Sequence, residues 1–134
     1  MKNRILAFIA VMLLISCLFT VYAEETGSVY RASEAIDYCD ISLRSSGTKL
    51  TATATISANG RCEKIGFKYI FIQELRDGKW VTIASDYSIY GYNVTTKDAV
   101  LSCTKESGKQ YRATASGYAL LDGVSDTAWC SSEH

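Results

Sequence analysis

The sequence predicts an all-β protein, a single antiparallel β-sandwich of about seven strands that follows an N-terminal signal peptide. Apolar and polar residues alternate with a period of two in several segments, which is typical of strands that bury one face. Gly, Asn and Asp interrupt these segments, and helix signals are scarce between them. Short strands separated by turn residues, with no helices between them, indicate two packed antiparallel sheets.

The first 23 residues have the layout of a secretory signal peptide. Two basic residues, Lys2 and Arg4, precede an almost unbroken apolar run that closes on the small residue Ala23. Such a segment is removed during export. We therefore expect cleavage after Ala23 and a secreted, extracellular domain over residues 24–134.

Two other outcomes for the N-terminal segment stay open. Its apolar run is close to the roughly 20 residues that a bilayer span needs, so it could be retained as an anchor. Leu14-Ile15-Ser16-Cys17 also resembles a bacterial lipobox, in which the cysteine is lipidated and becomes the new N-terminus. A lipoprotein usually has a polar tether after that cysteine, whereas residues 18–21 are apolar. Membrane contact is expected only through an uncleaved or lipidated N-terminus.

Size and charge narrow the class of partner. Removal of 23 of the 134 residues leaves 111, which fits one domain. This part keeps all 14 acidic residues and 12 of the 14 basic ones, so its net charge is −2. Nucleic acids and anionic membrane surfaces are bound by clustered Lys and Arg. The basic residues here are scattered singly, so neither partner is expected.

The first two strands are predicted from alternation. An opening strand is expected over residues 35–43, with Ile36 and Ile41 in the core. Residues 50–57 alternate strictly between apolar and hydroxyl-bearing side chains, which indicates a strand with one dry face. The apolar positions of this second strand are Leu50, Ala52, Ala54 and Ile56.

A central strand and a hairpin are expected next. Residues 64–74 are the most hydrophobic stretch after the leader. Strict alternation places Ile65, Phe67, Tyr69 and Phe71 on one face of this strand, and Ile70 and Ile72 on the other. Asp77-Gly78 separates it from a strand over residues 80–84. Asp-Gly between two such runs predicts a tight hairpin, because its turn positions need positive φ angles.

Three more strands are expected over residues 99–104, 110–119 and 126–130. The segment 108–126, GKQYRATASGYALLDGVSD, resembles the penultimate strand and last hairpin of immunoglobulin-like and fibronectin type III domains. In those domains a tyrosine at the start of the strand anchors a loop through its hydroxyl. Tyr111 occupies the matching position, and the alternative is that it is only a large strand residue.

Four cysteines follow the leader, namely Cys39, Cys62, Cys103 and Cys130. An even number in an exported domain predicts two disulfides, because that compartment is oxidising. Antiparallel pairing of the first two strands is expected to bring Cys39 and Cys62 together. Cys103 and Cys130 are both expected at the opposite end of the sandwich. We therefore favour Cys39–Cys62 and Cys103–Cys130 among the three possible connectivities.

Motifs along most of the chain after the leader resemble small exported proteins of Gram-positive bacteria that are grouped only as a domain of unknown function. The matching residues are Arg31-Ala32-Ser33, Ile65-Gly66, Trp80 and Tyr111-x-Ala113. These are structural positions, so the resemblance implies an exported protein and carries no activity with it. The four cysteines lie outside the match and gain no support from it.

The sequence does not predict an enzyme. The only histidine is His134, the last residue, so a Ser-His-Asp arrangement has no suitable base. The aspartates lie mostly at expected turns, where their side chains bond to the local backbone. No Gly-rich phosphate loop and no closely spaced Cys and His ligands occur, so we expect no cofactor and no metal.

The segment 85–93, SDYSIYGYN, is the candidate ligand-binding stretch. Its tyrosines Tyr87, Tyr90 and Tyr92, with Trp80 on the preceding strand, could present aromatic faces at one edge of the sandwich. Aromatic rings combine apolar area with a polar tip, which suits contact with an extracellular glycan or protein. The alternative is that these tyrosines are ordinary strand residues that bind no ligand, since tyrosine is a good strand former.

Two further functions are weighed against a binding module. A secreted effector, such as an inhibitor or an antimicrobial protein, would suit a disulfide-stapled exported domain. The chain has no proline to stiffen an inhibitory loop, and its charge is not that of a cationic membrane-lytic protein. A structural component of the cell surface is the third option.

Overall fold

The computed structural model describes residues 33–134, so the expected leader and Cys17 lie outside the described residues. This part of the chain forms seven strands, and it contains no helix that is long and apolar enough to span a membrane. The strands are β1 (Ile36–Ser46), β2 (Lys49–Cys62), β3 (Lys64–Arg76), β4 (Lys79–Gly91), β5 (Val94–Thr104), β6 (Tyr111–Leu121) and β7 (Val124–Glu133).

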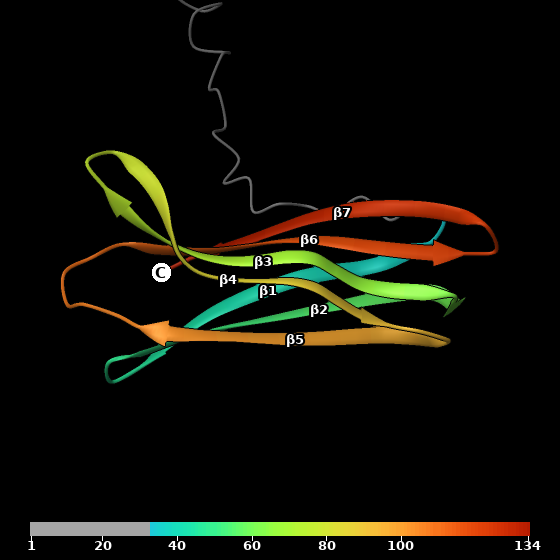
Figure 1. The fold of residues 1–134 in the computed structure, drawn as a ribbon, viewed down its shortest axis with the longest axis horizontal. Coiled ribbons are helices and arrows are strands. Elements are labelled where there is room, and N and C mark those ends of the chain that lie inside the picture. Colours follow the sequence, from blue (N-terminus) through green and yellow to red (C-terminus); the bar gives the residue numbers. More distant parts are fainter. Residues whose placement is uncertain (1–32) are drawn as a thin grey trace, which may run out of the picture.

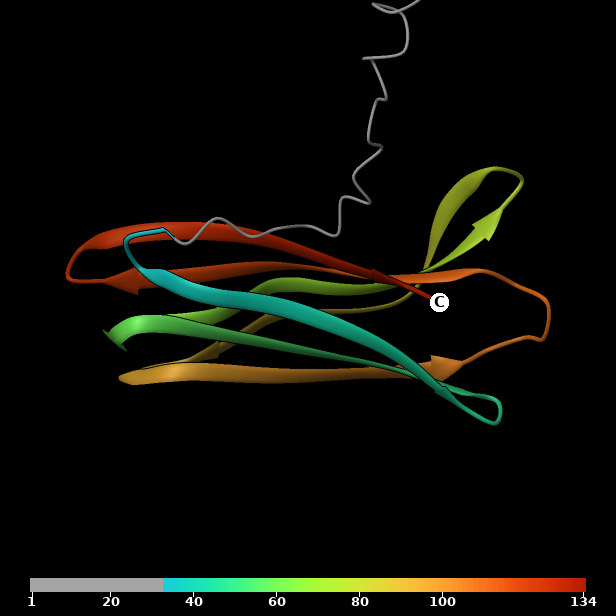
Figure 2. The same cartoon turned by 180° about the vertical axis from the view of Figure 1, so that it is seen from behind.

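Two antiparallel sheets pack face to face, with strand orders β1-β2-β5 and β4-β3-β6-β7 (Figure 1). This arrangement confirms the predicted all-β sandwich of seven strands. The fourth strand joins β3, whereas in constant-type immunoglobulin domains the fourth strand extends the other sheet. At one edge of the sandwich, β1 of the smaller sheet lies beside β7 of the larger sheet (Figure 2).

The core lies between the two sheets and follows the predicted alternation in most strands. Ile36, Ile41 and the four apolar positions predicted for the second strand are all buried. Facing them, β6 contributes small residues apart from Tyr111, and β3 contributes large ones. The inward residues of these two strands are Ile65, Phe67, Ile70, Ile72, Tyr111, Ala113, Ala115 and Ala119. Burying one Ile or Phe side chain stabilises the fold by about 1.5–3 kcal/mol.

The predicted face assignment of β3 is wrong, and a β-bulge is the reason. The pairing of β3 with β6 shifts between Phe67 and Tyr69, so Lys68 is an extra residue on β3. A bulge interrupts the alternation of side chains. Ile70 therefore joins Phe67 in the core, while Tyr69 turns to the outer face of the sheet.

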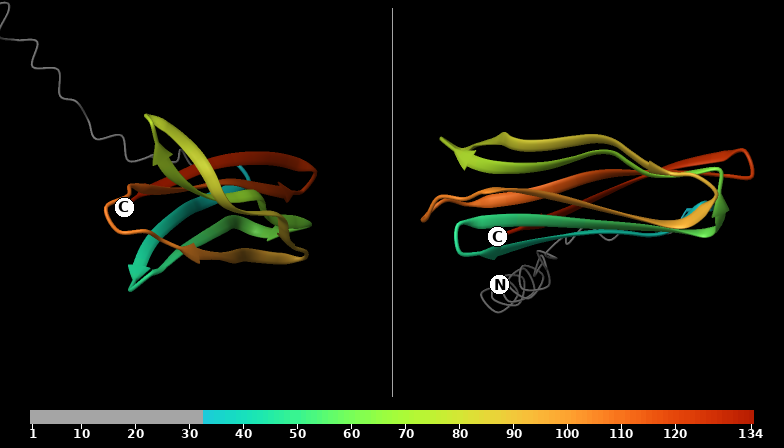
Figure 3. Two further views of the ribbon diagram at one scale, coloured as in Figure 1. Left: turned by 60° about the vertical axis from the view of Figure 1, so that its left-hand side comes forward. Right: turned by 60° about the horizontal axis from the view of Figure 1, so that its bottom comes forward.

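Strand β4 is longer than expected, because the tyrosine stretch continues the strand as far as Gly91. Its pairing with β3 shifts opposite Ile72, and Ser88 has a positive φ of 58°. The predicted hairpin is confirmed, with φ angles of 49° at Asp77 and 75° at Gly78. The tip of this hairpin, yellow-green in Figure 3, leans away from the rest of the sandwich.

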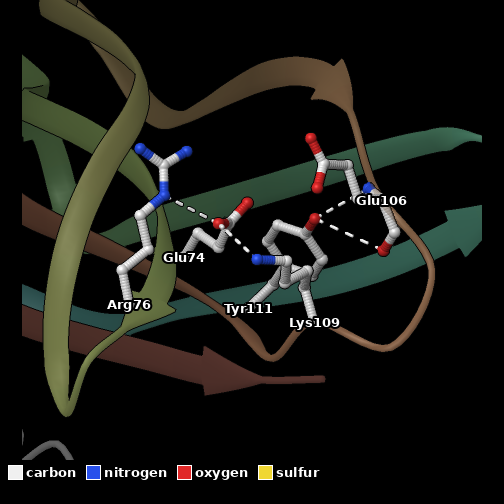
Figure 4. A network of polar contacts seen from close by, with 5 residues as sticks. All are labelled: Glu74, Arg76, Glu106, Lys109 and Tyr111. Atoms are coloured by element: carbon white, nitrogen blue, oxygen red, sulfur yellow. Dashed lines mark hydrogen bonds and ion pairs between the residues drawn. The ribbon is translucent and has the colours of Figure 1, made fainter.

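Tyr111 anchors the loop between β5 and β6, which confirms the role inferred from the resemblance. Its ring is buried at the start of β6. The backbone N–H of Glu106 donates a hydrogen bond of 2.8 Å to the Tyr111 hydroxyl, which lies 3.4 Å from the carbonyl oxygen of the same residue (Figure 4). The hydroxyl therefore satisfies backbone groups of a loop that has no ladder of its own.

A buried carboxylate lies beside this anchor. Glu74 of β3 is only 4% exposed, and Arg76 Nε donates a 2.7 Å hydrogen bond to its Oε1 (Figure 4). The ammonium of Lys109 lies 3.8 Å from the same oxygen. The hydrogen bond from Arg76 and the two positive charges hold the pKa of Glu74 below its ordinary value, although burial opposes them.

Candidate functional site

The outer face of the β4-β3-β6-β7 sheet carries aromatic side chains from all four of its strands. Strand register aligns Tyr87 of β4 with Tyr69 of β3, then with Ser116 of β6 and Trp129 of β7. One level of the sheet therefore holds three rings with a serine between two of them. The bulge at Lys68 is what turns Tyr69 to this side.

The rings are in contact with one another. Tyr69 stacks on Phe71 with 4.4 Å between ring centroids. Trp129 meets Tyr69 edge to face at 5.6 Å, and Tyr87 meets Phe71 in the same way at 5.6 Å. We call Tyr87, Phe71, Tyr69 and Trp129 the aromatic row. Its two ends, Tyr87 and Trp129, are each 60% exposed, and Tyr69 and Phe71 between them are partly exposed.

Ser116 shows how closely the row covers the sheet. Its outward position lies between Tyr69 and Trp129, yet the residue is only 3% exposed. A small side chain at this point lets the two flanking rings approach each other. Burial against this surface raises the pKa of the Tyr69 hydroxyl, and a hydrogen bond with Ser116 opposes that rise.

A second aromatic contact lies one step along the same face. Tyr90 of β4 and Tyr118 of β6 both pair with Gly66 of β3, and their rings meet edge to face at 6.2 Å. The ammonium of Lys64 lies 3.9 Å from the centroid of Tyr90, and that of Lys68 lies 5.4 Å from the centroid of Tyr118. Both distances are within the range of cation–π attraction.

Gly66 is required at the centre of this second contact. Its φ is 153°, and a Cβ there would lie 2.0 Å from the carbonyl oxygen of Ile89 and 2.9 Å from Tyr90 Cα. Backbone atoms of β4 cannot move away without breaking the pairing. A glycine therefore lets β4 approach β3 closely where Tyr90 crosses to Tyr118.

The structure separates the four predicted ligand-binding residues. Tyr87 belongs to the aromatic row and Tyr90 to the second contact. Trp80 lies close to the turn of the β3–β4 hairpin, with the Arg112 guanidinium 4.5 Å from its ring centroid. Tyr92 is 63% exposed in the turn between β4 and β5.

Sequence reasoning missed four residues of this face, namely Tyr69, Phe71, Tyr118 and Trp129. Each belongs to a strand other than β4, so none lies near the tyrosine stretch in the sequence. The strand register alone brings them together. The alternation of β6 and β7 would have placed Tyr118 and Trp129 on the outward side, but only the bulge at Lys68 adds Tyr69 and Phe71.

The sequence matches no family model and no curated protein. The function of this face must therefore be inferred from its own geometry.

The cysteine pairs expected from the sequence are not the ones that the fold brings together. All four cysteines of the described part are free thiols, and Cys39 Sγ lies 3.5 Å from Cys130 Sγ. Cys39 of β1 pairs with Ile56 of β2, whereas Cys103 of β5 pairs with Leu50 of β2. Cys62 is six residues beyond Ile56, and Leu50 is six residues before it. Six regular strand residues span about 20 Å, which keeps Cys103 away from Cys130. Between Ser57 and Cys62 the register of β2 shifts, yet the β5 partners of Ile56 and Cys62 are still three residues, or about 10 Å, apart, which is more than a disulfide can bridge.

No metal or catalytic cluster accompanies the aromatic face. Residues 33–134 contain no group of three or more His, Cys, Asp or Glu side chains that could hold a metal ion. His134 Nε2 lies 2.9 Å from Ser45 Oγ at the end of the sandwich. Within the same residues, no carboxylate hydrogen-bonds to this imidazole to orient it as a base.

Proposed function

We propose that this protein is a secreted, non-catalytic binding module and that it binds an extracellular glycan on the outer face of the four-stranded sheet. The observation that carries the proposal is the aromatic row, which crosses the sheet from Tyr87 on one edge strand to Trp129 on the other. Soluble proteins rarely leave contiguous apolar surface of this kind exposed unless it binds something.

The chemistry of the face suits a sugar polymer. Aromatic rings present apolar area to the C–H faces of a sugar while their hydroxyl and indole groups stay available for hydrogen bonds. Lys64 and Lys68 add donors beside the rings, and Lys68 already donates a 3.0 Å hydrogen bond to the Thr127 hydroxyl. Small-molecule sites are usually concave. An open row across a sheet favours an extended ligand that lies along the surface.

Export is part of this proposal. A leader over residues 1–23 would deliver the domain to the compartment where glycans are exposed. Lipidation at Cys17 is the alternative, and it would hold the same face at a membrane surface. The mass of the N-terminal peptide of the exported protein separates the two, because cleavage after Ala23 and lipidation at Cys17 leave different first residues.

A glycan array followed by calorimetric titration of any hit tests the proposal. The test variant is Trp129→Ala combined with Tyr87→Ser, which removes the exposed ends of the row. Matched controls are Tyr38→Ser on β1 of the other sheet and Tyr92→Ser in the β4–β5 turn, since both tyrosines are similarly exposed. Circular dichroism would confirm that every variant is folded.

We expect the row variant to bind at least about 30-fold more weakly, as the loss of a central aromatic contact is worth about 2 kcal/mol. Both controls should bind as the unmodified protein does. Absence of glycan binding by the unmodified protein would overturn the proposal, as would equal losses in the controls. If a protein bound through the same row, the row would still be a binding site, but the glycan ligand proposed here would be wrong.

A further inference from the structure

The two sheets carry one cysteine each at the point where β1 and β7 meet. Cys39 is on β1 of the smaller sheet, and Cys130 is on β7 of the larger sheet. Their sulfur atoms lie 3.5 Å apart, and both residues are at least 95% buried. No covalent link other than the backbone joins the sheets within residues 33–134, where every cysteine is a thiol.

We propose that Cys39 and Cys130 form a disulfide that joins the two sheets, while Cys62 and Cys103 stay as thiols. Register along β2 excludes the other pairs. Cys62 ends β2, and Cys103 pairs with Leu50, twelve residues before that end. On β5 the partner of Cys62 is Val94, nine residues from Cys103, which spans roughly 30 Å, and a disulfide needs Cα atoms within about 7 Å.

The surroundings of the two sulfurs leave room for the bond. Gly117 of β6 lies against them, and a Cβ at this position would be 3.0 Å from Cys39 Sγ. It would also lie 2.8 Å from the end of the Ile56 side chain. A larger residue at 117 would take the space that the sulfurs occupy. The bond requires the two atoms to approach from 3.5 Å to about 2.05 Å, which small side-chain rotations can supply.

The bond forms by thiol–disulfide exchange with a small or protein disulfide, such as oxidised glutathione or an exported oxidoreductase. Cys39 attacks as a thiolate. The attack joins Cys39 to one sulfur of the oxidant and releases the other as a thiol. Cys130 then loses its proton and attacks Cys39, which releases the second thiol.

Two protons and two electrons thus pass from the cysteine pair to the oxidant, which is reduced to two thiols. Both cysteines are buried in the folded sandwich, so the exchange takes place while the sheets are still coming together. This proposal does not depend on which ligand binds the aromatic row.

Peptide mapping tests the pairing directly. The full chain is refolded with oxidised and reduced glutathione, unfolded, treated with N-ethylmaleimide to block thiols, and digested with trypsin without reduction. Cleavage after Lys and Arg puts each of the four cysteines that follow the leader in its own peptide, over residues 32–44, 62–64, 98–105 and 113–134, and leaves Cys17 in a separate peptide. We expect peptide 32–44 linked to 113–134, with the other two peptides alkylated. Linkage of 32–44 to 62–64, or alkylation of all four peptides, would overturn the proposal.

Thermal unfolding supplies a second measurement. The disulfide would join residues that are 91 positions apart and so would restrict the unfolded chain. Adding a reductant should therefore lower the melting temperature of the refolded protein by roughly 10–20 °C. The double variant Cys39→Ala, Cys130→Ala should give the same melting temperature with and without the reductant. The matched variant Cys62→Ala, Cys103→Ala should keep the full response. A reductant response that survives in the first double variant would contradict the proposed pair.

Discussion

Tyr69 and Trp129 meet edge to face across β6, with 5.6 Å between their ring centroids, and Ser116 lies between them in the strand register. These two rings come from strands that are not neighbours in the sheet. The contact therefore depends on a small residue at position 116. It also joins the centre of the aromatic row to the edge of the sheet.

Trp129→Ala is expected to cost little stability. The indole is 60% exposed, so the change removes one edge-to-face contact, worth about 1 kcal/mol, and little buried area. Urea denaturation measures the loss. Phe67→Ala is the matched control on β3, because this buried ring should cost about 3–5 kcal/mol. If both changes cost the same, the row would be part of the structural core and not a binding surface.

Tyr111→Phe should destabilise the protein by about 1–2 kcal/mol. The change keeps the buried ring and removes only the hydroxyl, which leaves the N–H of Glu106 without its hydrogen bond. The free energy of unfolding in urea is the measurement. Tyr118→Phe serves as the control, because Tyr118 contacts Tyr90 and Lys68 through its ring, and it should change stability by less than about 0.5 kcal/mol. Equal effects would argue against the loop anchor.

Acid is expected to destabilise the fold through Glu74 and Asp126. Both pKa values are lowered in the folded state, Glu74 by Arg76, and Asp126 by hydrogen bonds from Ser33 and from the backbone N–H of Ala35. A carboxylate with a lowered pKa stabilises the folded state above its ordinary pKa, and this contribution is lost as the pH falls through the folded value. The urea concentration at the midpoint of unfolding should therefore decrease once the pH is lowered below about 4.5.

The variant Glu74→Gln tests the first of these two carboxylates. It should be less stable than the unmodified protein at pH 7, where the carboxylate is charged and paired with Arg76. The difference between the two proteins should shrink as the pH falls to 3. A difference that stays constant over this range would show that the ionised form of Glu74 does not contribute.

Gly66→Ala should destabilise the protein by roughly 3 kcal/mol. The added Cβ would lie 2.0 Å from the Ile89 carbonyl oxygen, and the φ of 153° is strained for alanine. Gly60→Ala is the control, since its Cβ would meet the flexible end of Leu121 at 3.2 Å. Thermal unfolding of both variants provides the comparison. Similar melting temperatures would mean that β4 can move away from β3 at no cost.

Most strands and the hairpin turns could be predicted because their signals are local. Alternation in β2 and β6 places apolar residues on one face, and the structure buries those residues. Asp77-Gly78 predicted a hairpin because few other pairs tolerate two positive φ angles. The end of β4 was less predictable, since Ser85 to Gly91 mixes polar and aromatic residues without a clear period.

The aromatic face and the cysteine contact could not be predicted, because both depend on how strands align. Alternation does not reveal the length of a strand. β2 runs on to Cys62, past Ala58, the partner of Ile36 near the start of β1, so Cys39 pairs with Ile56 instead of lying beside Cys62. Likewise, no local signal marks Lys68 as an extra residue, although it decides where Tyr69 points.

Lys68 and Ser88 occupy facing positions in β3 and β4, since Phe67 pairs with Ile89 and Tyr69 with Tyr87. Leaving out both residues together would remove this interruption of the inward and outward alternation, with Phe67 and Ile70 still inside and Tyr69 and Tyr87 still outside, while the shift between Ile72 and Gln73 would remain. The sandwich is thus compatible with a chain two residues shorter. Related sequences of that length would keep the same interior and the same ring-bearing surface.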